Sequence, residues 1–285
     1  MIHIIIPVHN RLAATLRCIK SIQKQKIKKK LNIIIVDDGS SDGTSAYIAK
    51  NFSNIKILKG SGFMFWGGAV NFGIESVLKK KKPGDWVLLI NNDVELKTET
   101  ISSLISISEN NKRKSVVIPL TLSIIDKKTV IKSGTIIKSW FLNISKHLFA
   151  GMKNNEIMDK KPIKVDIMTC RCALHPIEMF KIAGNYDAKN FNHYGCDDEF
   201  SIRIKKYGYS ILLCPSVTIY LTDNKSSIKQ KKLNIKNFIH SFFSMKSSSN
   251  IIDKFYLTMK LVPLYAKLSF FLIGVLKSLY VFLKK

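Results

Sequence analysis

LNIIIVDDGSSDGT (Leu31–Thr44) is the stretch of sequence that decides the fold. A run of apolar residues ends in two aspartates, and a Gly/Ser/Asp-rich turn and a short helical segment near Thr44–Lys50 follow at once. An apolar run of this length is typical of a strand that is covered on both faces, as in the parallel sheets of α/β proteins. Ligands of such sheets bind beyond the carboxyl ends of the strands. Asp37 and Asp38 are therefore candidate ligand-binding residues.

The same alternation of strand and helix continues on both sides of this stretch. Apolar runs at Ile2–Val8, Ile55–Leu58 and Trp86–Ile90 alternate with helical spacing at Leu12–Ile22 and Ala69–Leu78. Strands that alternate with helices predict an α/β fold, a mostly parallel sheet flanked by helices.

Composition narrows the possible partners without naming one. The chain of 285 residues has 46 Lys and Arg against 20 Asp and Glu, a formal charge of +26. This charge favours nucleic acid, an anionic bilayer or phosphorylated substrates. The lysines are spread along the chain and not gathered on one element with aromatic residues, which argues against a nucleic-acid-binding protein.

Cysteine usage and the N-terminus indicate a reducing cytoplasm. Five cysteines are an odd number and do not suggest a disulfide framework. Cys170 and Cys172 would share a face on a strand, but with His193 and Cys196 they match no common zinc spacing, so small buried thiols are favoured. The opening residues have no basic start and no small-residue cleavage site typical of a signal peptide.

A second set of polar residues follows the strand at Trp86–Ile90, in the segment LLINNDVEL (Leu88–Leu96). Polar side chains at the end of a buried strand are costly unless they meet a ligand or a metal. Asp93 is a candidate ligand for Mg²⁺ or Mn²⁺, which bind a carboxylate together with substrate phosphates. A simple helix cap at Asp93 is the alternative.

Between these two motifs lies GSGFMFWGGAVNFGI (Gly60–Ile74). Its glycines, Gly67 and Gly68 among them, permit close approach of the backbone to a ligand. A helix that begins near Gly68 would offer N–H groups to anionic oxygens. The glycine spacing is not that of the dinucleotide-binding fingerprint.

Three consecutive acids occur in FNHYGCDDEFSIRIKKYGY (Phe191–Tyr209), at the start of a basic helix. An acid in a cleft can take a proton from an acceptor hydroxyl, which makes Asp197 and Asp198 candidate catalytic bases. Favourable placement of acids against the helix dipole is the alternative explanation.

The C-terminal segment, Phe255–Lys285, is strongly apolar. Lys260, Lys267, Lys277 and Lys284 would lie within one third of a helix circumference, and the longest uncharged stretch, Leu268–Leu276, is far shorter than the roughly 20 residues that span a bilayer. A helix in the membrane interface, with its lysines toward phosphate groups, is favoured over a core-packing helix pair.

The motifs taken together resemble those of the inverting family 2 glycosyltransferases, most closely the bacterial branch that includes rhamnosyltransferases of cell-surface polysaccharide synthesis. The resemblance is carried by IIIPVHNR (Ile4–Arg11), VDDGSSDGT, FWGGAVNFGI, NNDVEL and HYGCDDEFSIRIKKYGY, and it covers residues 1 to about 250. It implies a GT-A fold in residues 1–227, with a nucleotide-sugar-binding half (1–114), an acceptor-binding half (115–227) and a basic helical extension (228–285).

The resemblance also implies roles for single residues. It implies a nucleotide pocket lined by Pro7, His9 and Asn10, with Asp38 facing the base and Asn71 near the donor. Asn92 and Asp93 occupy the metal-binding strand end, where Asn-Asn-Asp leaves one clear carboxylate. Asp197 matches the general base, with Asp198 the competing choice. Cys170-Arg171-Cys172 stands where many relatives have Gly-Arg-Gly.

The function that the resemblance implies is transfer of a sugar, with inversion, from dTDP-rhamnose or a UDP-sugar to a saccharide or lipid-linked saccharide. The enzyme would work at the cytoplasmic face of the inner membrane, on an anionic surface. A sugar nucleotidyltransferase is the enzyme alternative, but it needs a Gly-rich phosphate loop after the first strand, where this chain has PVHNR. A non-catalytic basic protein that binds nucleic acid is the third and weakest alternative.

Overall fold

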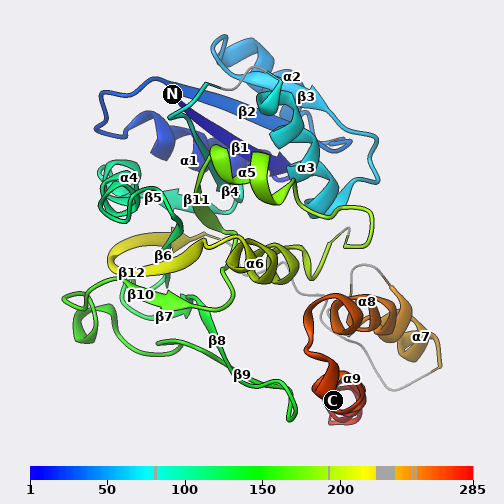
Figure 1. Ribbon diagram of the computed structural model, residues 1–285. Coiled ribbons are helices and arrows are strands. Elements are labelled where there is room, and N and C mark those ends of the chain that lie inside the picture. The colour runs from blue at the N-terminus through cyan, green and yellow to red at the C-terminus, as the bar shows by residue number, and fades with distance from the viewer. Residues whose placement is uncertain (80–81, 192, 223–234, 245–246, 248, 285) are drawn as a thin grey trace.

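The computed structural model describes residues 1–79, 82–191, 193–222, 235–244, 247 and 249–284. Within these ranges a central sheet of ten strands is flanked by helices, which confirms the predicted α/β class (Figure 1). The strands of this sheet are β1 (Ile2–Val8), β2 (Leu31–Asp37), β3 (Lys56–Lys59), β4 (Trp86–Ile90), β5 (Val94–Leu96), β6 (Ser115–Ser123), β7 (Val130–Lys132), β10 (Ile163–Val165), β11 (Cys172–Pro176) and β12 (Ser210–Leu221).

The order of the strands explains where the polar motifs meet. Along the main path the order is β10-β12-β6-β11-β4-β1-β2-β3, and β5 pairs with β12 while β7 pairs with β6. Strands β1 to β4 are parallel to one another where they pair, as predicted. Strand β11 is antiparallel to both β4 and β6 and joins the two halves of the sheet. Asp93 lies in the turn between β4 and β5, so it is not a helix cap.

Helices cover both faces of the sheet. The helices α1 (Leu12–Gln23), α2 (Thr44–Asn51) and α4 (Thr100–Asn110) pack on one face, and α3 (Phe65–Leu78), α5 (Glu178–Ala183) and α6 (Cys196–Lys206) on the other. The strand residues are apolar on both sides because both faces are buried.

A glycine sets how closely α3 approaches the sheet. A Cβ atom at Gly73 would lie 2.5 Å from Cγ2 of Ile5 and 3.0 Å from Cγ2 of Val36. These distances are too short for any other residue without movement of the sheet side chains. The close approach brings the N-terminal end of α3 to the carboxyl ends of β1 and β2, where Asp37 and Asp38 lie.

A separate two-stranded hairpin, β8 (Thr135–Ser139) and β9 (Ile144–His147), follows β7 along the chain. A short 3-10 helix, η1 (Asn154–Glu156), follows it. The C-terminal helices are α7 (Ile235–Phe243), α8 (Ile251–Leu261) and α9 (Lys267–Leu283), with the 3-10 turn η2 (Leu264–Ala266) before α9. Figure 1 shows these helices gathered beside α6 and the hairpin. The expected domain boundary at 227/228 lies outside the described residues.

Three lysines of the C-terminal helices make contacts within the protein. The ammonium group of Lys260 pairs with Asp187, and that of Lys277 donates to the backbone oxygen of Asn143. Lys267 donates to the backbone oxygen of Met259 at 2.9 Å. These lysines turn toward the protein because carboxylate and carbonyl oxygens of the neighbouring elements are within their reach.

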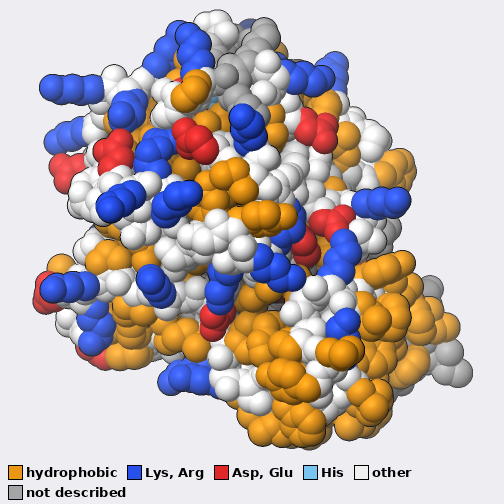
Figure 2. Space-filling view, viewed as in Figure 1, with side chains coloured by type: hydrophobic (Ala, Val, Ile, Leu, Met, Phe, Trp, Pro, Cys, Tyr) orange, Lys and Arg blue, Asp and Glu red, His pale blue; other side chains and the backbone are white. Residues whose placement is uncertain are grey.

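The apolar side of α9 is the side that is exposed. Leu264, Leu268, Leu272, Leu276 and Tyr280 are each more than half exposed, and they follow one another at helical spacing. Figure 2 shows hydrophobic side chains gathered over the region of the C-terminal helices. Among the described residues, Leu264–Leu283 is one helix of 20 residues that is long and apolar enough to cross a membrane, and only 22% of its most apolar part is buried. This finding concerns length and composition only, so the interfacial placement expected from the shorter uncharged stretch stays a prediction.

Candidate active site

The carboxyl ends of β1 and β2 are tied together by hydrogen bonds between their loops. His9 Nδ1 lies 2.6 Å from the backbone oxygen of Asp38, and the N–H of Ser41 donates to Asn10 Oδ1 at 2.8 Å. Asn10 adopts a left-handed backbone conformation with a φ of 60°, which asparagine tolerates better than most residues. His9 is exposed, and Pro7 and Asn10 are half-buried, so three of the predicted pocket residues are accessible at this edge.

The two aspartates at the end of β2 have different partners. Asp37 accepts hydrogen bonds from the N–H of Ser40 and the hydroxyl of Ser45, so it holds the turn that leads into α2. Asp38 accepts the N–H groups of Gly62 at 2.7 Å and Phe65 at 2.9 Å. Both carboxylates are buried and engaged within the protein. Asp38 therefore orders the glycine-rich loop before α3.

The glycine-rich loop differs from the prediction that a helix begins near Gly68. Helix α3 begins at Phe65, and the N–H of Gly68 donates to the backbone oxygen of Met64 at 3.1 Å. Gly67 and Gly68 are thus inside the first turn of α3, where helical hydrogen bonding takes up the N–H group of Gly68. The carboxylate of Asp38 occupies the place at the helix start that was expected for an anionic ligand.

Two further predicted residues hold elements together. Asn71 Nδ2 donates to the backbone oxygen of Tyr186 at 2.7 Å, which ties α3 to the loop after α5. Asn92 Nδ2 donates to the hydroxyl of Thr15 at 3.0 Å, which ties the turn after β4 to α1. Asn92 is buried and Asn71 half-buried.

Asp93 is buried and paired with two arginines. Nη1 of Arg171 lies 3.2 Å from Oδ1 and 3.1 Å from Oδ2 of Asp93. Nη1 of Arg11 lies 3.6 Å from Oδ2. The Asp93 side chain is 4% exposed, and those of Arg171 and Arg11 are 18% and 33% exposed. The negative charge is therefore balanced by guanidinium groups from two different parts of the chain.

The side chains available near Asp93 determine how a divalent ion could bind there. In the described part of the chain, no group of three or more His, Cys, Asp and Glu side chains could hold a metal ion. One carboxylate still fits Mg²⁺ or Mn²⁺ when the remaining ligands are water and substrate phosphate oxygens. The residues thus fit a metal that arrives with a diphosphate, not one that the protein holds alone. All five cysteines are free and buried, as predicted.

Asp197 and Asp198 open helix α6 and are only partly exposed. Asp197 accepts hydrogen bonds from backbone N–H groups, those of Asp198 and Cys170 among them, but burial outweighs them and raises its pKa. Burial and the neighbouring Asp197 raise the pKa of Asp198 to about 7, while Lys254 acts in the opposite direction. A carboxylate whose pKa is close to neutral is suited to accept a proton from a hydroxyl group.

One short segment connects the two groups of acids. The Arg171 side chain contacts Asp93, and the preceding residue, Cys170, lines the same cavity as Asp197. The thiol of Cys170 lies 3.4 Å from the hydroxyl of Tyr186, which in turn lies 3.1 Å from His175 Nε2. These contacts are buried and fix the segment between the strand-end acid and the acids of α6.

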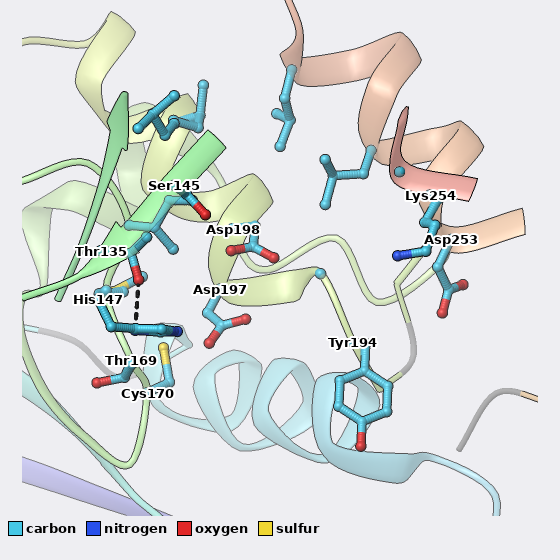
Figure 3. A pocket seen from close by; sticks show the side chains of 18 of the residues that line it. Thr135, Ser145, His147, Thr169, Cys170, Tyr194, Asp197, Asp198, Asp253 and Lys254 are labelled. Carbon is cyan, nitrogen blue, oxygen red and sulfur yellow. Dashed lines mark hydrogen bonds between the residues drawn. The ribbon is translucent and has the colours of Figure 1, made fainter. Parts of the chain in front are cut away.

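A cavity of about 570 Å³ lies in front of the acid pair. The carboxylates of Asp197 and Asp198 point into it, and Lys254 of α8 lies across from them (Figure 3). Trp66 and Arg171 line it on the side of the β4 strand end. The side chains from the hairpin and the C-terminal helices that also line it include Thr135, Trp140, Asn143, His147, Leu257, Leu261 and Phe270.

The sequence pattern did not single out several of these residues. Arg171 was noted only as a retained residue between two cysteines, and its pairing with Asp93 spans 78 positions. Lys254 and Trp66 lay in segments interpreted as an anchor and a helix start. For Arg171, the available signal was an arginine between two small residues directly before a buried strand. A single lysine at a helical position carries no local signal, so Lys254 could not be found in this way.

Comparison with known proteins identifies the family and the fold. The model of the family described as "Glycosyl transferase family 2" matches residues 3–181. The uncharacterized glycosyltransferase MG060 homolog of Mycoplasma pneumoniae is 28% identical over 153 residues, which are 52% of this chain and 48% of that protein. The chain thus spans about half the length of this curated relative.

Solved structures share the fold at low sequence identity. GalNAc-T7 with UDP, GalNAc and Mn²⁺ superimposes with a TM-score of 0.62 at 15% identity, over 95% of this chain and 53% of that one. S. aureus TarS in complex with UDP-GlcNAc gives 0.59 at 13% identity, over 91% and 66% of the two chains. The family match covers more than half of the chain, from the first strand through α5. The protein therefore belongs to glycosyl transferase family 2.

Proposed function

We propose that this protein transfers a sugar, with inversion, from a nucleotide-diphosphate donor to a hydroxyl group of a saccharide or lipid-linked saccharide. The observation that carries the proposal is the acid pair Asp197 and Asp198, which faces a cavity beside the buried Asp93–Arg171 pair. A UDP-sugar or dTDP-rhamnose is the proposed donor. UDP or UDP-GlcNAc is present in the similar structures of TarS.

The residues of the two halves would divide the work. Pro7, His9 and Asn10 lie at the accessible strand edge proposed for the nucleotide. A carboxylate of the acid pair would accept the proton of the acceptor hydroxyl, whose oxygen forms a bond to the anomeric carbon as the bond to the diphosphate breaks. Attack from the face opposite the diphosphate inverts the configuration at that carbon. Arg171, at the edge of the cavity, is placed to attract the departing diphosphate.

Mg²⁺ or Mn²⁺ is the proposed cofactor, with Asp93 its protein ligand. When bound, such an ion neutralises negative charge on a diphosphate leaving group. Because Arg171 and Arg11 already balance Asp93, we expect measurable metal binding only when the donor supplies phosphate oxygens. Isothermal titration with Mn²⁺ alone and with Mn²⁺ plus UDP tests this, and tight binding of Mn²⁺ alone would contradict it.

The donor is tested with a thermal-shift panel of nucleotide-sugars, each with Mn²⁺ and with a chelator. Ligands that bind only the folded state raise the melting temperature, by an amount that grows with the logarithm of ligand concentration over Kd. We expect at least one UDP- or dTDP-sugar to stabilise the protein, and Asp93→Ala to weaken that stabilisation and abolish transfer. A protein that responds to none of them, and transfers none, would not be this enzyme.

The catalytic base is tested with single substitutions of the acid pair. Asp197→Asn should bind donor as the wild type does and lose at least about 100-fold in transfer, since general base catalysis contributes on the order of 10²–10⁴-fold. Asp198→Asn is the matched control on the next residue. If only Asp198→Asn loses transfer, the base is Asp198 and the register carried over from the family is shifted by one.

We also propose that the C-terminal helices place the protein on the cytoplasmic face of the inner membrane. The support is the exposed row Leu268, Leu272 and Leu276 on α9 together with the formal charge of +26. Exposed apolar patches of this kind mark protein or membrane contacts, and an anionic leaflet attracts clustered lysines. Apolar burial, and not lysine contacts by Lys260 or Lys277, would supply the specific part of the binding.

Cosedimentation with phosphatidylglycerol vesicles tests this proposal. Replacement of Leu268, Leu272 and Leu276 by Gln should release the protein from the vesicles in high salt, where the electrostatic part is screened. Ile125→Gln, at a residue 89% exposed elsewhere on the surface, is the control and should not change binding. Equal binding of the triple variant and the wild type would refute a membrane role for this face.

A sugar nucleotidyltransferase and a nucleic-acid-binding protein, the two alternatives from the sequence, gain no support. Membership in glycosyl transferase family 2 favours glycosyl transfer over either of them.

A further inference from the structure

The cavity at the acid pair is closed on one side by the C-terminal extension. Leu257 and Leu261 of α8 and Phe270 of α9 line it, opposite the hairpin of β8 and β9. A Cβ atom at Gly195, directly before α6, would lie 3.6 Å from Cδ1 of Leu257. Helix α8 is thus packed against the start of the helix that carries the two acids.

Several contacts hold the extension in this place. Lys260 of α8 pairs with Asp187, in the loop after α5. Asn143, at the tip of the hairpin, donates through Nδ2 to the backbone oxygen of Phe270 at 3.0 Å. The rings of Trp140 and Phe270 lie 5.7 Å apart. Contacts to the loop after α5 and to the hairpin thus hold α8 and α9 against the part of the protein that carries the acid pair.

Lys254 is the residue that α8 contributes to the cavity. Its ammonium group points into the cavity toward the side on which Asp198 lies (Figure 3). Burial lowers the pKa of Lys254, and the negative charges of Asp198 and Asp253 act in the opposite direction. The ionisable groups that line the cavity together with the acid pair are Lys132, His147, Cys170, Arg171, His193, Tyr194, Asp253 and Lys254.

The geometry points to Lys254 as a positioning residue of the active site, one whose positive charge across the cavity favours the ionised form of the acid pair, of Asp198 first (Figure 3). The C-terminal extension would then be part of the catalytic machinery in addition to any contact with a membrane. The inference rests on the proposed glycosyl transfer, because only that function gives the acid pair its role.

Charge is what distinguishes this role from mere packing. Without Lys254, Asp198 would have Asp197 as its adjacent charge, and two neighbouring carboxylates hinder each other's ionisation. A group that needs a charged Asp198 would then work only at higher pH. Replacement by an uncharged side chain of similar length removes the charge and keeps most of the packing.

A carboxyl ¹³C NMR titration of the full chain, labelled in its aspartates, tests the inference without any substrate. The Asp198 signal is identified by its loss in Asp198→Asn. We expect it to titrate near pH 7 in the wild type and about one unit higher in Lys254→Met, since an opposite charge at close range shifts a pKa by roughly one to three units. Lys254→Arg, which keeps the charge, should titrate close to the wild type.

Lys267→Met serves as the control, because it removes one charge from the same extension at a residue outside the cavity lining. It should leave the Asp198 titration unchanged. An unchanged titration in Lys254→Met would overturn the inference, as would an equal shift in Lys267→Met. Should Lys254→Met not fold, Lys254→Gln is measured in its place.

Once a donor is found, the pH profile of transfer gives a second reading. The acidic limb of the profile should move about one pH unit upward in Lys254→Met and stay in place in Lys254→Arg. If the wild type transfers no sugar, the proposed function fails while the NMR titration still decides the inference. If the wild type transfers and the limb does not move in Lys254→Met, the inference alone fails.

Discussion

Replacement of Arg171 by methionine tests the ion pair at the centre of the site. The change keeps an unbranched apolar stem without the guanidinium group, and it leaves Asp93 buried with Arg11 at 3.6 Å as the remaining arginine. Breaking a fully buried ion pair costs on the order of 3–5 kcal/mol, because the remaining charge has lost its partner. Arg171 is 18% exposed and Arg11 stays nearby, so we expect the smaller loss of about 2–3 kcal/mol.

The assay is thermal and urea unfolding of the purified full chain. At roughly 2–4 °C per kcal/mol for a chain of this size, the melting temperature should fall by about 5–10 °C. Arg11→Met is the matched control. Its guanidinium is farther from Asp93 and 33% exposed, so its loss should cost less than about 1 kcal/mol.

The double variant Asp93→Asn, Arg171→Met isolates the interaction itself. Removal of both charges leaves no buried ion, so the double variant should be more stable than the sum of the two single effects predicts by at least about 1 kcal/mol. Additive effects within about 0.5 kcal/mol would show that the two side chains do not interact in solution. That result would refute the reasoning about the charge balance at Asp93.

Three further predictions concern other parts of the fold. Asp38→Asn should destabilise the protein by about 1–2 kcal/mol and increase proteolysis in the glycine-rich loop, because a neutral amide accepts less strongly from the N–H groups of Gly62 and Phe65; an unchanged digestion pattern would contradict the role of Asp38 in ordering that loop. Gly73→Ala should cost about 1–2 kcal/mol in urea unfolding, because its Cβ would lie 2.5 Å from Ile5 Cγ2, and a more stable variant would mean that the sheet yields easily. The raised pKa of Asp198 means that the folded state binds the proton more tightly than the unfolded state, so this residue lowers stability as pH rises from about 4 to 7; Asp198→Asn should therefore gain stability relative to wild type across that range, and parallel pH curves would argue against the raised pKa.

The sheet was predictable because its pattern is local. The run Trp86–Ile90 is bounded by polar residues on both sides, so its ends could be placed from the sequence, and the observed strand has the same bounds. The helix after the glycine-rich loop was placed several residues too late. Gly67 and Gly68 argue against a helix by propensity, but the Asp38 carboxylate caps the backbone at Phe65 and lets the helix begin before them.

The partners of the acids could not be predicted, since they come from distant parts of the chain. The position of Asp93 at a strand end was evident, whereas its contact with Arg171 depends on the antiparallel insertion of β11 between β4 and β6. The two-residue spacing of Cys170 and Cys172 also did not indicate where these residues lie. Cys170 and Cys172 were expected on one face, but β11 begins only at Cys172, and the two thiols lie in different apolar clusters.

The orientation of the C-terminal helices has a physical cause that also affects the active site. A lysine-bearing helix face is normally expected toward water or phosphate groups. Here Lys260 of α8 reaches Asp187, and Lys277 of α9 reaches the backbone oxygen of Asn143. The lysine side of these helices is therefore turned toward the loop after α5 and the hairpin, and the leucine side of α9 is left exposed. The same orientation brings Lys254 to the cavity. An exposed apolar face of α9 and a positive charge beside the acid pair are therefore two consequences of one docking arrangement.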